Sequence, residues 1–146
     1  MPAFTRRQII QFGAVAVLAL QFPAVAYADF LATKPRAVFQ VSDADPQKWS
    51  LTLANVGNAQ EALGKDAADI EIVAFGPGID MLKKDSPVAA RVAEALHNGV
   101  RVVACQNTMR SHKLTPADML PEVGYVPSGV VEIMQREREG YAYLRS

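Results

Sequence analysis

The chain has 146 residues, half of them hydrophobic, and its 15 basic residues balance its 15 acidic ones. This length and composition are typical of one domain with a substantial apolar core. A formal net charge of zero gives no basis for nucleic acid or an anionic membrane surface as a partner, and the single cysteine, Cys105, excludes an internal disulfide.

The first 28 residues have the pattern of a signal peptide. Arg6 and Arg7 form its positive region, the apolar stretch Ile9–Leu20 follows, and an Ala-Tyr-Ala cleavage site occupies residues 26–28. The apolar stretch is shorter than the about 20 residues of a comfortable membrane span. We therefore expect a signal peptide at 1–28, a mature domain at 29–146 without a stable membrane span, and a periplasmic or otherwise exported location. The route, twin-arginine or general, stays open, and a retained membrane anchor is the alternative to cleavage.

Strand and helix patterns alternate along the rest of the chain. Apolar and β-branched runs predict five strands, which are Ala37–Val41, Ile70–Phe75, Val100–Ala104, Gly124–Pro127 and Tyr141–Leu144. Capping residues followed by apolar positions at helical spacing predict three longer helices, which are Pro46–Leu63, Pro87–His97 and Gly129–Glu139. Shorter helical turns are expected at 108–112 and 115–120. This alternation predicts a three-layer α/β/α domain with a five-stranded, mostly parallel sheet.

The predicted helices differ in which residues they turn toward the core. The first has one apolar stripe, formed by Trp49, Leu53, Val56, Ala59 and Leu63. The last is expected to turn its apolar residues inward and its charged residues outward; the inward set is Val130, Val131, Ile133 and Met134, and the outward set is 135–139. In the second strand, Glu71 interrupts an otherwise apolar run.

The most informative stretch runs from Val100 to Ser111, where a β-branched strand ends at Cys105 and polar residues follow. In α/β folds, binding sites form beyond the carboxyl ends of the strands. If a helical turn begins after Cys105, its N–H groups and Arg110 would lower the thiol pKa from about 8.5 toward neutrality. The alternative is a small buried apolar role for the cysteine.

A second candidate for the site is the loop Gly76–Leu82, which follows another strand end. Gly76 and Gly78 give it backbone freedom, and we consider them possible pocket residues. The alternative is a connecting loop that packs Ile79, Met81 and Leu82 on the core. The loop lacks a phosphate-binding fingerprint, and one cysteine with two histidines, without paired spacing, give no readable metal site. No cofactor or metal is therefore expected.

Two motifs carry a resemblance to a known family. Residues 99–110, with Leu114-Thr115 and Leu120-Pro121, resemble the central signature of the DsrE/DsrF-like family. Residues 126–132 and 139–144 resemble the ending of a subgroup without assigned activity. The resemblance covers roughly residues 36–146. It implies a five-stranded α/β/α domain that assembles into trimers or hexamers.

The resemblance also implies a role for Cys105. In the best-understood members of the family, a cysteine at this strand end carries sulfur as a persulfide and passes it to a partner. Physically, a thiolate attacks a sulfane donor, and an acceptor thiol then removes the outer sulfur. The other residues expected to shape the Cys105 pocket are Gln106, Asn107, Thr108 and Arg110.

Two hypotheses of different classes follow. The first is an exported DsrE-like protein in which Cys105 binds or relays sulfur, with a possible donor or acceptor protein as partner. Any activity would then be that of a sulfur carrier or transferase, and not that of a multiple-turnover hydrolase or oxidoreductase. The alternative is a non-catalytic, oligomeric small-molecule-binding or structural module, with a pocket lined by residues 76–82 and the Cys105 segment.

Overall fold

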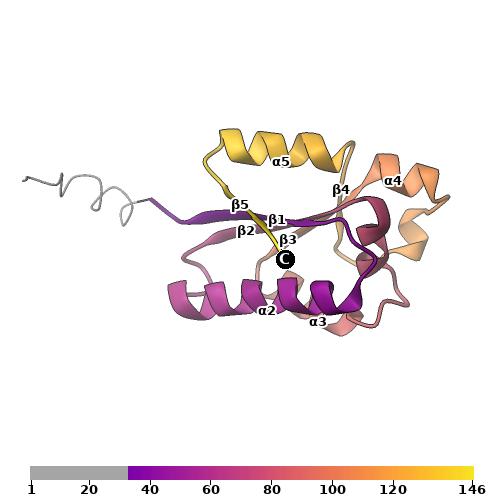
Figure 1. Cartoon of the computed structure of the whole chain (residues 1–146). Helices are drawn as coiled ribbons and strands as arrows, with labels where there is room; N and C mark the ends of the chain where they lie inside the picture. The colour runs from indigo at the N-terminus through magenta and orange to yellow at the C-terminus, as the bar shows by residue number, and fades with distance from the viewer. Residues whose placement is uncertain (1–32) are drawn as a thin grey trace, which may run out of the picture. The chain divides into compact units, whose positions relative to one another are not determined.

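The computed structural model describes residues 33–146, so the predicted signal peptide at 1–28 lies outside the described residues. The described part forms one five-stranded sheet with helices on both faces (Figure 1). The strands are β1 (Arg36–Val41), β2 (Asp69–Ala74), β3 (Arg101–Cys105), β4 (Gly124–Val126) and β5 (Ala142–Arg145). Their order is β4-β3-β2-β1-β5, and every neighbouring pair is parallel. The predicted fold class is confirmed, and the sheet is parallel throughout.

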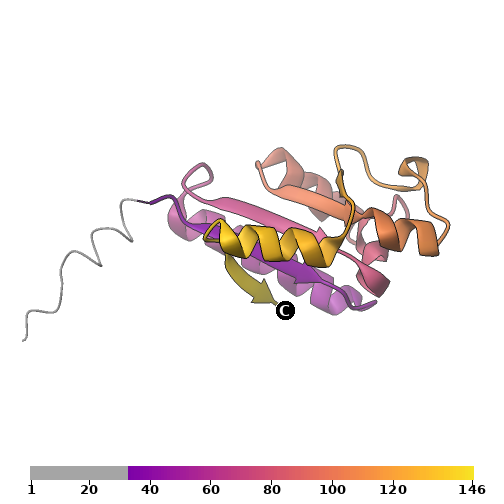
Figure 2. The same cartoon turned by 90° about the horizontal axis from the view of Figure 1, so that it is seen from above.

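Helices α2 (Pro46–Leu63) and α3 (Ala89–His97) cover one face of the sheet, and α5 (Gly129–Arg138) covers the other (Figure 1). The 3-10 helix η1 (Gly76–Leu82) follows the carboxyl end of β2, and the short α4 (Gln106–Ser111) follows that of β3. A second 3-10 helix, η2 (Pro116–Asp118), lies between α4 and β4 in the chain. Viewed from above, α4 lies beside the beginning of α5 at this end of the sheet (Figure 2).

Helix α2 has the predicted bounds and the predicted cap. The carboxylate oxygen Oδ1 of Asp45 accepts a hydrogen bond from the backbone N–H of Gln47 at 2.8 Å, which satisfies one of the free donors of the first turn. At the other end, Gly64 adopts a φ of 97°, a conformation that glycine reaches without strain. Leu63 is 47% exposed, so the predicted apolar stripe of this helix ends before its last residue.

Two apolar clusters hold the layers together. The larger lies between the sheet and α2, α3 and η1, and includes Trp49, Ile72 and Met81. The smaller lies under α5 and joins Val38, Val73 and Ile133. Burial of apolar surface of this kind is the main stabilising contribution in such a domain.

Several element bounds differ from the sequence prediction. The stretch 76–82, predicted as a loop, forms the 3-10 helix η1. Its residues Ile79, Met81 and Leu82 are buried in the core, as one of the two interpretations of this stretch predicted. Helix α3 begins at Ala89 and not at Pro87, because residues 86–88 form a turn first. Helix α4 begins at Gln106, directly after β3, earlier than the predicted turn at 108–112.

The predicted orientation of α5 is wrong for three of its four apolar residues. Val130, Val131 and Met134 are exposed, and only Ile133 of that set is buried. Glu132 is buried instead, and Arg136 is largely buried. The physical reason is the buried carboxylate of Glu71 in β2 beneath this helix, which needs a cation beside it and receives Arg136.

Candidate functional site

Cys105 is the last residue of β3 and the N-cap of α4. Its side chain is only 4% exposed. Because α4 follows the strand without a loop, the free N–H groups of its first turn lie next to the sulfur. The predicted position of the thiol, at a strand end where a helix begins, is confirmed.

The Sγ atom of Cys105 is surrounded by hydrogen-bond donors. Burial acts to raise the pKa of Cys105, but the Thr108 hydroxyl and the backbone N–H groups of Thr108, Gly129 and Asn107 donate to the sulfur. Their combined effect holds the pKa of Cys105 below its ordinary range, because hydrogen bonds to the charged form of an acid favour ionisation. These donors favour ionisation of the thiol relative to a buried cysteine without them.

The hydroxyl of Thr108 links this site to η1. Its Oγ1 atom accepts a hydrogen bond from the backbone N–H of Gly76 at 2.9 Å. A hydroxyl can accept and donate at the same time, so its hydrogen is still available to Cys105. Gly76 has a φ of 52°, which favours glycine. Of the two predicted loop glycines, Gly76 thus takes part in the site through Thr108.

Gly78 serves the fold and not the thiol. It is buried in η1, and a Cβ atom on it would collide with the backbone carbonyl of Val41 at the end of β1. Its lack of a side chain therefore lets η1 pack closely on the sheet. Gly78 is not among the groups that affect the pKa of Cys105, so its predicted place in the site stays a prediction.

Gly129 is a site residue that the sequence prediction missed. It is the first residue of α5 and donates its N–H to Cys105. A Cβ on Gly129 would lie 2.8 Å from Cδ1 of Phe75, so only glycine lets α5 begin this close to the end of β2. A glycine that begins a helix just after a strand is the local signal that marks such a close approach.

Gln106, Asn107 and Arg110 have other surroundings. The guanidinium group of Arg110 donates to the side-chain oxygen of Asn107, and both residues are exposed. The backbone N–H of Asn107 donates to the carbonyl of Pro127 at 3.3 Å, and the same N–H also contributes to lowering the pKa of Cys105.

Gln106 and Arg110 line a cavity of about 240 Å³, together with Met109, Leu114, Pro116 and Tyr125. Cys105 does not line this cavity. Tyr125 pairs with Ala104 in the sheet, and adjacent residues of a strand point to opposite faces. The ring of Tyr125 and the thiol of Cys105 therefore lie on opposite faces of the sheet.

Within residues 33–146, no group of three or more His, Cys, Asp or Glu side chains is arranged to hold a metal ion. No helix in the same part of the chain has the length and apolar character of a membrane span.

A family model places this architecture among known proteins. The model of the DsrE/DsrF-like family matches residues 36–145. The chain belongs to the DsrE/DsrF-like family. The predicted family is thereby confirmed, and the match includes β3, Cys105, α4 and α5.

Solved structures of similar proteins agree with this DsrE-like assignment. MTH1491 from Methanobacterium thermoautotrophicum, a protein of unknown function, is 37% identical, with a TM-score of 0.73 over 77% of this chain and 99% of that one. BT1422 from Bacteroides thetaiotaomicron, also of unknown function, is 12% identical with a TM-score of 0.63, over 76% of this chain and 94% of that one. The ychN protein from E. coli is 11% identical with a TM-score of 0.64, over 78% of this chain and 100% of that one. At such low identity the last two show the shared fold alone. A comparison with curated proteins found no match.

Proposed function

We propose that this DsrE-like protein is a sulfur carrier in which Cys105 takes up one sulfur atom as a persulfide and passes it to an acceptor thiol. The observation that supports this most directly is the set of donors around the sulfur, from Thr108, Asn107 and Gly129. The thiolate is the nucleophile in sulfur exchange, and a fold that stabilises the thiolate increases the fraction that can react at neutral pH.

The proposed reaction balances without an external oxidant. The Cys105 thiolate attacks the outer sulfur of a donor persulfide, R–S–SH, so that a new S–S bond forms on Cys105 while the donor S–S bond breaks. The donor leaves as the thiolate R–S⁻, and Cys105 becomes Cys–S–SH. An acceptor thiolate then attacks the outer sulfur, takes it as a persulfide, and returns Cys105 to the thiolate form. One sulfane sulfur moves, and no net electrons are exchanged.

The burial of Cys105 favours a slender donor. At 4% exposure, the sulfur admits a terminal sulfur atom more readily than a bulky group. The same burial fits the alternative function, a non-catalytic binding or structural module in which the thiol only fills space. Reactivity toward a sulfane donor separates the two.

The test is intact mass spectrometry of the protein after incubation with inorganic polysulfide. We expect a gain of one sulfur atom in mass, reversed by a thiol reductant and absent in Cys105→Ser. The matched control is Ser111→Ala, which removes a hydroxyl from the same helix, one that hydrogen-bonds to the Thr108 carbonyl and not to the thiol. No adduct on the wild-type protein would reject the carrier function and leave the binding module.

We further propose that the carrier works outside the cytoplasm, on the basis of the signal-peptide pattern at residues 1–28. Protein for the mass measurement is therefore prepared from the periplasmic fraction of cells that express the full chain. A mass that corresponds to a chain beginning at Asp29 would support export and cleavage. Full-length protein in the membrane fraction would support a retained anchor instead.

Self-association is the third part of the proposal. The apolar residues on the outer side of α5, Val130, Val131 and Met134, are about half exposed, although apolar side chains of a helix ordinarily face a packed surface. A contact between copies of the chain would bury them, in agreement with the trimers or hexamers that the resemblance implies.

A further inference from the structure

Glu71 is a buried charge that the proposed reaction leaves unexplained. It lies within β2, and its side chain is 1% exposed. Its Oε2 atom forms ion pairs with the guanidinium group of Arg101 and, at 2.7 Å, with Nε of Arg136. Its Oε1 atom has no hydrogen-bond partner among residues 33–146. A buried carboxylate of this kind is costly, and apolar residues of similar volume often stabilise a core as well or better.

The two partners of Glu71 lie on the two elements that form the thiol site. Arg101 is the first residue of β3, the strand that ends at Cys105. Arg136 is in α5, the helix that begins at Gly129 and donates its first N–H to the same sulfur. We call Glu71, Arg101 and Arg136 the Glu71 cluster. One carboxylate oxygen of this cluster therefore holds together the strand and the helix that meet again at Cys105.

The start of α5 is fixed by the packing of Gly129 on Phe75 and by the carbonyl of Pro127, which accepts a hydrogen bond from the N–H of Asn107, whereas the end of α5 is fixed by the Glu71 cluster. Among the large apolar side chains of α5, only Ile133 is buried against the sheet, while Val130, Val131 and Met134 are exposed. Arg136 is held in turn by Glu132 at 2.7 Å and by Glu139 at 2.6 Å, so it is fixed relative to its own helix. Since seven residues of helix span about 10 Å, a shift of Arg136 along the sheet carries Gly129 with it.

We propose that Glu71 is a positioning residue for Cys105, which holds α5 against β3 so that the N–H of Gly129 faces the sulfur. The inference rests on the proposed function only in taking Cys105 as the working thiol.

The sign of the effect distinguishes positioning from a direct effect of charge. Removing a negative charge from the neighbourhood of a thiol makes its ionisation easier and lowers its pKa. Losing the Gly129 donor does the opposite and raises the pKa of Cys105. The substitution Glu71→Gln therefore gives opposite results under the two explanations.

Other charged groups near Glu71 also influence the result of this substitution. Arg101 of β3 and Arg136 of α5 pair with Glu71. Glu132 of α5 and Glu139, the residue after that helix, pair in turn with Arg136. Arg36 of β1 pairs with Asp69 of β2 and donates to the carbonyl of Glu139. Burial raises the pKa of Glu71, and Arg101 and Arg136 oppose that rise. Glu71→Gln leaves this set with one negative charge fewer, which strengthens the expected downward shift of the thiol pKa under the direct-charge explanation.

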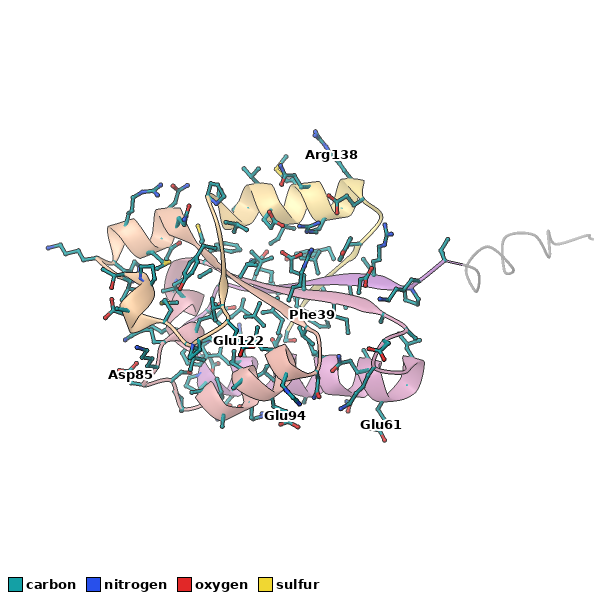
Figure 3. All side chains as sticks on the ribbon, turned by 180° about the vertical axis from the view of Figure 1, so that it is seen from behind. Phe39, Glu61, Asp85, Glu94, Glu122 and Arg138 are labelled. Atoms are coloured by element: carbon teal, nitrogen blue, oxygen red, sulfur yellow. The ribbon has the colours of Figure 1, made fainter. Side chains whose placement is uncertain are left out.

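The experiment is a pH titration of the thiolate by its ultraviolet absorbance, with the same titration of a Cys105→Ser protein subtracted. This readout does not require a reagent to reach the buried sulfur. For Glu71→Gln we expect the pH of half-ionisation to rise by about one unit, which is about tenfold less thiolate at neutral pH. The matched control is Glu61→Gln in α2, an exposed side chain on the face of the sheet opposite to α5 (Figure 3), which should titrate as the wild type does.

A second variant keeps the test decisive if Glu71→Gln does not fold. Arg101 is half exposed, and Arg101→Gln removes only the β3 side of the cluster, so a smaller rise is expected. In a folded variant, an unchanged or lowered half-ionisation pH would overturn the positioning role. That result would leave the carrier function intact if polysulfide still adds one sulfur to the wild type. Conversely, if the wild-type protein forms no sulfur adduct but Glu71→Gln raises the half-ionisation pH, the carrier function is rejected and the positioning role of Glu71 is supported.

Discussion

At the residue scale, the main feature is the exchange of solvent for fixed donors around one sulfur atom. Cys105 loses contact with water on folding, which by itself disfavours its charged form. The hydroxyl of Thr108 and three backbone N–H groups replace that solvation and more than compensate for it. Because most of the donors are backbone groups, few single substitutions remove them without moving the chain.

Thr108→Val is the exception, because it nearly preserves shape while removing the hydroxyl, which donates to Cys105 and accepts from the N–H of Gly76. We expect the pH of half-ionisation of Cys105 to rise toward 9.0, measured by thiolate absorbance, with Ser111→Ala unchanged as the control.

The same substitution should alter stability in a pH-dependent way. An acid whose pKa is lowered on folding adds stability that is absent below the folded pKa and grows as the pH rises toward the unfolded value. Thr108→Val should therefore reduce the gain in the free energy of unfolding between neutral pH and pH 9.0. An equal gain in both proteins would show that Thr108 does not act on the thiol.

The sequence predicts the local half of this site and not the distant half. Cys105, Thr108 and Asn107 are neighbours in the chain, and a strand that turns directly into a helix places them together. Gly129 reaches the sulfur from 24 residues further along, and its place depends on the packing of α5 against Phe75. No periodicity or cap encodes that contact.

At the scale of single elements, Gly129 and Gly57 form a natural comparison, since both are helical glycines. A Cβ on Gly129 meets Phe75 at 2.8 Å, whereas a Cβ on Gly57 in α2 meets nothing within 4 Å. We expect Gly129→Ala to destabilise the domain by about 1–3 kcal/mol through overpacking. Gly57→Ala should stabilise it by about 0.5–1 kcal/mol, because alanine loses less backbone freedom in a helix.

Denaturant unfolding of both glycine variants measures these changes. Thiolate titration of Gly129→Ala should also show a raised half-ionisation pH, while Gly57→Ala should not. A neutral effect of Gly129→Ala on both quantities would mean that α5 begins further from Phe75 than the structure shows.

Helix α5 shows where pattern-based prediction fails at this scale. Its apolar residues are expected in the core because amphipathic helices usually bury their apolar side. The sheet beneath this helix carries Glu71, and a buried carboxylate attracts Arg136 and with it the polar side of the helix. The cap of α2 forms as expected, because a cap depends on residues within one turn of it.

At the scale of the whole domain, the outward apolar side of α5 leads to a prediction about assembly. Val131→Glu places a charge among exposed apolar residues on α5 and should shift the protein toward monomers, as measured by light scattering after size-exclusion chromatography. Leu63→Glu is the matched control, since Leu63 is equally exposed at the end of α2 on the opposite face. A wild-type protein that is already monomeric would contradict the proposed self-association.

The architecture of the domain is predictable because many residues along the chain independently indicate the same strands and helices. Alternating apolar runs, caps and glycine stops each indicate the same βα repeat, and parallel strands joined by helices permit few topologies. The single misassigned face of α5 did not alter the sheet order, because the order depends on the strands.

The thiol donors come from α4 and α5, and Thr108 is itself held by η1. Before these segments have come together, Cys105 is an ordinary thiol with about three per cent in the thiolate form at neutral pH. The lowered pKa of Cys105 is thus a consequence of folding and not of the neighbouring sequence alone. The pKa of the thiol therefore reports that β3, α4, α5 and η1 have come together.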